Sequence, residues 1–197
     1  MSKLKLNWIE PLGGPLLLLP RRFLPHWTGG GPIALSDLFG NWWEKQKGRE
    51  LTDYDRACAV GGYAGVIEVG TGSGLVLADE PNPTTWWKAR GRAGGYLVRW
   101  VYADHDDDVH RALQEIPTRL KAEEVVTFRV DHPELVLFDS VYPGREAGTG
   151  LAKHSRSLSV HLARGYYRVK TSICQPDETT RLVLHQFTPH AKTRATT

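Results

Sequence analysis

The segment Leu158-Ser159-Val160-His161-Leu162 alternates strictly between apolar and polar side chains. Successive side chains of a β-strand point to opposite faces, so this alternation is typical of a strand with one face buried. Comparable alternations, or short apolar runs bounded by turn residues, recur along most of the chain. They predict further strands over residues 14–19, 66–69, 75–78, 96–102, 125–130, 135–138, 166–173 and 182–187. We expect antiparallel sheets, with residues 53–78 forming a β meander.

One α-helix is predicted over residues 104–116. Its acidic start can cap a helix N-terminus and interact favourably with the helix dipole, and Pro117 ends it. The helical apolar stripe consists of Val109, Leu113 and Ile116. A similar spacing over residues 36–47 predicts a second helix, although Gly40 within it disfavours helix formation.

The two halves of the chain resemble each other in pattern, which suggests an internal duplication. Three segments match in the same order: Pro15-Leu-Leu-Leu-Leu19 with Glu134-Leu-Val-Leu-Phe138, Gly62-Tyr-Ala-Gly-Val66 with Gly165-Tyr-Tyr-Arg-Val169, and Leu75-Val-Leu-Ala78 with Leu182-Val-Leu-His185. We therefore predict a mainly β protein of two similar small antiparallel β-sandwich halves, packed together and joined by one α-helix. A single α+β domain is the alternative. The predicted boundaries are 1–103, a connecting helix and linker at 104–124, 125–189, and a disordered tail at 190–197.

Composition and charge limit the classes to which the protein can belong. Hydrophobic residues make up 41% and charged residues 24% of the chain, the balance of a folded globular protein. The net charge of +3 is too small to predict attraction to nucleic acid or to an anionic membrane. The two cysteines, Cys58 and Cys174, have no partner residue at the spacing of a metal site or a redox motif, so we expect both to be buried thiols. The apolar run 16–19 lies between prolines and is too short for a signal peptide or a membrane span, so we expect a cytoplasmic protein.

No motif predicts catalysis. The glycine-rich segment 70–74 precedes a strand and not a helix, which favours a hairpin turn over a phosphate loop. Asp106 and His110 lie four residues apart on the predicted helix, although capping alone explains the carboxylates. A metal-dependent hydrolase that uses this pair and a further histidine is the alternative. We predict no catalytic residue, no metal ligand and no cofactor.

Contact residues are predicted from aromatic pairs and acidic clusters. Two Trp–Trp pairs lie in segments that read as irregular, where adjacent aromatic side chains cannot easily both point inward. Interfaces are enriched in such anchors, although core packing is the simpler explanation. The acidic clusters can serve as turn caps or as a charged interface rim. The predicted partner-binding residues are Trp42, Trp43, Asp53, Tyr54, Asp55, Asp79, Glu80, Trp86 and Trp87.

A nucleic-acid-binding module is a third alternative. Bases could stack on Trp86 and Trp87, and three cations follow them in the sequence, Lys88, Arg90 and Arg92. Three cations make a small basic groove, so nucleic acid is the least favoured partner.

Five segments, taken in order, resemble the immunity protein 21 family. They are Gly13-Gly-Pro-Leu-Leu-Leu-Leu-Pro20, Asp53-Tyr-Asp-Arg-Ala-Cys-Ala-Val60, Leu75-Val-Leu-Ala-Asp-Glu-Pro81, Val98-Arg-Trp-Val-Tyr-Ala-Asp104 and Leu137-Phe-Asp-Ser140. The resemblance extends from about Trp8 to Phe187. A more distant similarity links the chain to the competence protein J family of nuclease inhibitors.

The resemblance implies an antidote of a bacterial polymorphic toxin system. Such a protein binds a cognate toxin domain and blocks it before the producing cell is harmed, so the implied partner is a toxin protein. The family provides no catalytic residues to carry over. The segment Ile33–Leu51 is longer than the connection expected for the family, which makes Trp42 and Trp43 peculiar to this member.

Overall fold

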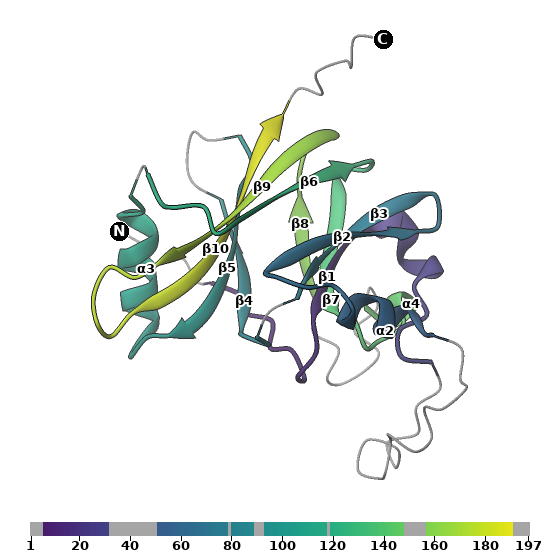
Figure 1. Ribbon diagram of the computed structural model, residues 1–197, viewed down its shortest axis with the longest axis horizontal. Helices are drawn as coiled ribbons and strands as arrows, with labels where there is room; N and C mark the ends of the chain where they lie inside the picture. The colour runs from purple at the N-terminus through teal and green to yellow at the C-terminus, as the bar shows by residue number, and fades with distance from the viewer. Residues whose placement is uncertain are drawn as a thin grey trace.

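Two five-stranded antiparallel sheets form the framework of the molecule (Figure 1). The computed structural model describes residues 6–31, 51–78, 80–88, 93–117, 119–147 and 157–190. Sheet I has the order β2-β3-β1-β7-β8, with β1 (Leu16–Pro20), β2 (Ala64–Val69), β3 (Gly72–Leu77), β7 (Glu134–Asp139) and β8 (Ser157–His161). Sheet II has the order β4-β5-β10-β9-β6, with β4 (Thr84–Trp87), β5 (Gly95–Tyr102), β6 (Glu124–Val130), β9 (Gly165–Cys174) and β10 (Arg181–His190).

The main hydrophobic core lies between the two sheets. Alternating side chains of each strand point to this space, because the period of a strand is two residues. This inter-sheet core includes Leu16, Leu18, Leu75, Leu77, Leu135 and Leu137 from sheet I, and Leu97, Phe128, Tyr167, Val169 and Phe187 from sheet II. A hydrogen-bonded link ties the sheets at one edge, where the Glu124 carboxylate accepts from the backbone N–H groups of Tyr63 and Ala64 at 2.9 and 2.7 Å.

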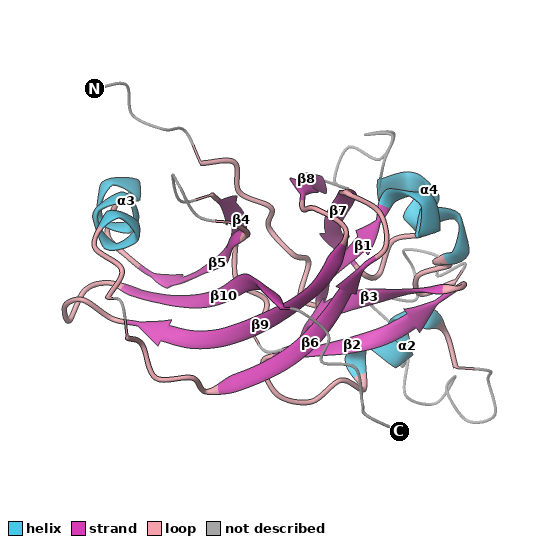
Figure 2. Cartoon of the chain, turned by 90° about the horizontal axis from the view of Figure 1, so that it is seen from above, coloured by secondary structure: helices cyan, strands magenta, loops and turns pink. Residues whose placement is uncertain are grey.

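Helices pack on the outer face of each sheet (Figure 2), and α3 covers only part of the outer face of sheet II. The 3-10 helix η1 (Arg21–His26), α2 (Asp53–Cys58) and α4 (Gly144–Ala147) pack on sheet I, and α3 (Asp106–Gln114) packs on sheet II. Trp27 lies buried beneath the helices of sheet I, and its indole N–H donates to the Ser140 carbonyl at 2.9 Å. The order of layers is therefore helices, sheet I, sheet II and α3.

The prediction of a mainly β protein of antiparallel, sandwich-like sheets with a connecting helix is confirmed. Among the described residues, each half of the sequence contributes five strands, split between the two sheets. The halves join strand to strand, at β1–β7 in sheet I and at β5–β10 in sheet II, and α3 connects them. The domain boundaries stay predictions. So does the duplication, because the matched hairpins β2–β3 and β9–β10 lie in different sheets.

Three local predictions were wrong. Residues 53–58 form α2 and not part of a β meander, because Thr52 and Asp55 make a capping box that starts a helix. Trp86 and Trp87 lie in β4 and not in an irregular segment, and Cys58 is exposed whereas Cys174 is buried as expected. The predicted helix at 36–47 and residues 191–197 of the predicted tail lie outside the described residues.

Candidate partner-binding surface

The predicted contact residue Asp53 holds α2 against the chain that follows η1. One oxygen of its carboxylate accepts from the backbone N–H and the hydroxyl of Thr28, both at 2.8 Å. The other oxygen pairs with the Arg56 guanidinium at 2.9 Å. These bonds are local and explain the carboxylate without a partner protein.

Tyr54 and Asp55 also serve the attachment of α2. Asp55 accepts from the backbone N–H of Thr52 at 2.8 Å, which completes the capping box. Tyr54 packs so tightly on Gly14 that a Cβ at that glycine would lie 2.5 Å from the tyrosine oxygen. Burial, followed by the neighbouring Cys58, raises the pKa of Tyr54, so the phenol stays protonated at neutral pH.

Removal of the helix cap is expected to destabilise the protein modestly. Thr52→Ala deletes the hydroxyl that accepts from the Asp55 backbone N–H at 3.2 Å. We expect a loss of about 1 kcal/mol in the free energy of unfolding, measured by urea denaturation. Thr188→Ala, at an exposed threonine of β10, is a suitable control and is expected to change stability by less than about 0.5 kcal/mol. An unchanged midpoint for Thr52→Ala would show that the cap does not fix α2.

The second predicted group lies at the edge strand of sheet II. Trp86 and Trp87 point to opposite faces of β4, and both are half-buried. Trp86 packs on Phe187 of the inter-sheet core, with ring centroids 5.5 Å apart, whereas Trp87 packs on Tyr96 on the outer face, at 5.4 Å. Glu80 is exposed, and its backbone carbonyl accepts from Arg99.

The structure does not bring the predicted residues together. The start of α2 lies on the outer face of sheet I, whereas β4 belongs to sheet II (Figure 1). Trp42, Trp43 and Asp79 lie outside the described residues, as do Arg90 and Arg92. The role of all these residues in binding a partner stays a prediction.

A continuous open surface lies on the outer face of sheet II, beyond the part that α3 covers. The inward side chains of β6 and β9 belong to the inter-sheet core, so the alternating residues must face outward. Strand pairing aligns these outward residues in three rows: Arg129–Tyr166–His190, Thr127–Arg168–Thr188 and Val125–Lys170–Gln186–Tyr96–Trp87. We call the surface formed by Thr127, Arg129, Tyr166, Arg168, Lys170, Thr188 and His190 the β9 face.

The β9 face is cationic. Arg168 is exposed and Lys170 half-buried, and Arg129 pairs with Asp131 at 2.6 Å. None of the side chains in the three rows is a carboxylate. A groove of about 520 Å³ continues from Tyr166 and His190 around the connection between β8 and β9, where Lys88 and Arg164 line it. We call it the β8–β9 groove.

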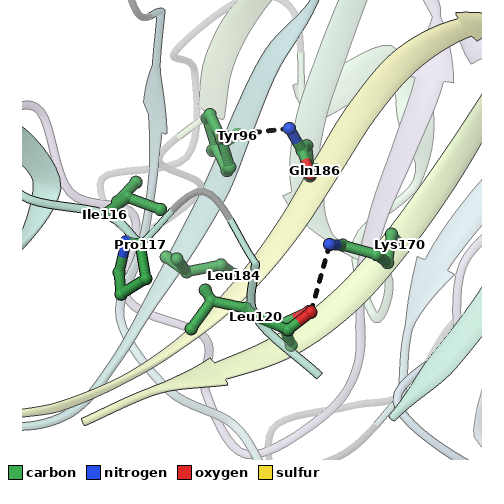
Figure 3. Close-up of a pocket in the computed structure, with 8 residues that line it drawn as sticks. Tyr96, Ile116, Pro117, Leu120, Lys170, Leu184 and Gln186 are labelled. Atoms are coloured by element: carbon green, nitrogen blue, oxygen red, sulfur yellow. Dashed lines mark hydrogen bonds between the residues drawn. The ribbon is translucent and has the colours of Figure 1, made fainter. Parts of the chain in front are cut away.

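A small pocket lies at the border between the β9 face and the segment after α3 (Figure 3). Ile116, Pro117 and Leu120 form one wall, while Tyr96, Lys170, Leu184 and Gln186 rise from sheet II. Lys170 donates to the Leu120 carbonyl at 3.4 Å, and Gln186 donates to the Tyr96 hydroxyl at 2.9 Å. The free volume of about 20 Å³ holds roughly one water molecule, so a metabolite does not fit.

A buried polar group lies on the inner face of sheet II. His185 Nδ1 is 2.9 Å from the Thr171 hydroxyl, and His185 and Arg99 are fully buried. Burial, and then the charge of Arg99, lowers the pKa of His185 to about 3, and burial lowers the pKa of Arg99 to about 10. The imidazole is therefore neutral at pH 7 and closed off from any substrate, which points to a structural role.

The hydrolase alternative gains no support from the geometry. Asp106 and His110 lie one turn apart on α3 as expected, but no group of three or more potential metal ligands occurs in the part of the chain that the structure describes.

No helix within the described ranges is long and apolar enough to cross a membrane.

The sequence contained a usable signal for the β9 face. Arg168 and Lys170 alternate with Tyr167 and Val169 within a predicted strand, which assigns the cations to one face. The matching rows on β6 and β10 were not visible, because the register that aligns the three strands is a tertiary feature.

Comparison with protein families gives a match over most of the chain. The family model of immunity protein 21 matches residues 7–180, which is most of the chain. Neither the curated proteins nor the solved structures contain a match. The extent of the family match shows that this chain belongs to the immunity protein 21 family.

Proposed function

We propose that this protein neutralises one cognate toxin by binding it, without any chemical step of its own. The family match over residues 7–180 is the observation that carries the proposal. An immunity protein must recognise its toxin, and inhibition by occupation of a surface requires only a rigid, complementary face.

The geometry is suited to this mode of action. The β9 face is an open surface on a sheet whose other side belongs to the inter-sheet core, so the strands that carry it are held in fixed positions. The adjoining pocket is too small for a substrate, while the surface itself is extended. Binding at such a face would block the toxin sterically.

The predicted contact residues enter this proposal as separate contacts, because the structure does not bring them together. Trp87 is the best placed, because it ends the row that runs through Tyr96, Gln186 and Lys170 into the β9 face. Trp86, Glu80 and the start of α2 lie outside that row. We place the protein in the cytoplasm of the producing cell, where it would meet its toxin before export.

Co-expression tests the proposed function. Cells that express the toxin domain encoded beside this gene should stop growing, and growth should return when this protein is expressed with it. The purified proteins should then elute together as a complex in size-exclusion chromatography. A toxin that remains lethal, together with separate elution, would refute the proposal.

A further inference from the structure

We propose that the β9 face and the β8–β9 groove together bind an acidic surface of the toxin. The inference rests on the proposed function, because it specifies the chemistry of the surface that the toxin presents. Support for the inference comes from the charge and exposure of the side chains of the β9 face, which the strand register aligns side by side.

The cations of this region form a local excess. The whole chain is nearly balanced, with 25 basic and 22 acidic residues. In contrast, the rows of the β9 face and the lining of the β8–β9 groove include Arg129, Arg168, Lys170, Lys88 and Arg164 and no carboxylate. Arg129 pairs with Asp131, whereas no ion pair of Arg168 or Arg164 is found among the described residues.

The neighbouring side chains fit a protein partner better than a single-stranded nucleic acid. Single-stranded nucleic acids require several aromatic rings on which successive bases stack. On the β9 face, Tyr166 is the aromatic residue, and the threonines Thr127 and Thr188 surround the exposed Arg168. One tyrosine anchor among arginines and small polar residues is typical of a protein interface.

Charge complementarity also restricts where the toxin is bound. A cleft that binds phosphate groups is itself cationic, so the β9 face would be repelled by it. The contact would therefore be an acidic region of the toxin outside any such cleft.

Charge reversal on β9 tests the inference in the purified complex. In Arg168→Glu/Lys170→Glu, two carboxylates would replace the two cations at the centre of the face. We expect binding of the toxin domain to weaken about 100-fold in isothermal titration calorimetry at low salt, because like charges oppose each other at the interface. The milder Arg168→Gln/Lys170→Gln should weaken binding about tenfold, and thermal melts check that both variants are folded.

A matched control separates the local effect from the change in net charge. Arg22→Glu/Arg145→Glu alters the net charge by the same amount, but Arg22 and Arg145 are exposed on η1 and α4, which cover the other sheet. Its affinity should stay within about threefold of that of the wild type. For the wild type, the association rate should fall as NaCl is raised.

The outcomes distinguish the two proposals. A wild-type complex that tolerates Arg168→Glu/Lys170→Glu would overturn the inference and leave the proposed function intact. Absence of any complex would end both. The NMR chemical shifts of Arg168 and Lys170 report binding of a polymer at the β9 face. If they show that an oligothymidylate binds there in preference to polyglutamate, the face belongs to nucleic acid, and this result would also overturn the inference.

Discussion

Phe187→Ala is expected to lower the free energy of unfolding by about 3–5 kcal/mol, measured by urea denaturation. The ring of Phe187 is almost fully buried between the sheets, with Trp86 and Tyr167 at centroid distances of 5.5 and 6.4 Å. Truncation removes these contacts and leaves a cavity in a core to which both sheets contribute. The whole protein should still unfold in one transition, because strand pairs join the two halves in each sheet.

The neighbouring residue provides the control for this substitution. Thr188 follows Phe187 on β10 but is exposed on the outer face. Thr188→Ala should therefore change the free energy of unfolding by less than about 0.5 kcal/mol. Two separate transitions, or a loss below 1 kcal/mol for Phe187→Ala, would contradict a shared inter-sheet core.

Acidification from pH 7 to pH 4 is expected to remove about 3 kcal/mol of stability through His185 alone. The folded protein holds the pKa of this imidazole at about 3, against 6.5 in the unfolded chain. Between these values the unfolded chain binds a proton that the folded protein excludes. The stabilising effect is therefore complete above pH 6.5 and is lost as the pH falls towards 3.

The variant His185→Asn isolates this contribution. Asparagine cannot be protonated in this range, and its amide can replace Nδ1 beside the Thr171 hydroxyl. Other groups still titrate in both proteins, including Asp139, whose buried carboxyl has a raised pKa and acts in the opposite direction. The difference between wild type and variant should shrink by about 3 kcal/mol from pH 7 to pH 4. A parallel pH dependence in the two proteins would show that His185 is accessible to protons.

Much of the strand content could be predicted from side-chain periodicity. The alternation in residues 158–162 and the apolar runs at 16–19 and 135–138 became β8, β1 and β7, because burial of one or both faces dictates those patterns. The acidic start and apolar stripe of α3 were equally informative. The first turn of α2 was missed because a capping box at Thr52 and Asp55 outweighs the strand-like composition that follows it.

The candidate surface was harder to predict, for a physical reason. Trp86 and Trp87 are conspicuous in the sequence. In the structure, however, the ring of Trp86 packs against Phe187 and the ring of Trp87 packs against Tyr96. Each cation of the β9 face lies in a sequence context that is common for an exposed strand residue. The pairing of β6, β9 and β10 brings these cations together on one surface, and this register cannot be derived from the periodicity of single strands.

A titration of toxin activity tests the central claim most directly. A fixed amount of purified toxin domain is mixed with increasing amounts of this protein, and the remaining toxin activity is measured. An inhibitor that acts by occupying a surface predicts a linear decline that reaches zero at one equivalent. Complete loss of toxin activity at a small fraction of an equivalent would reveal turnover, and undiminished activity at an excess would show that the toxin is not bound; either result would contradict the account.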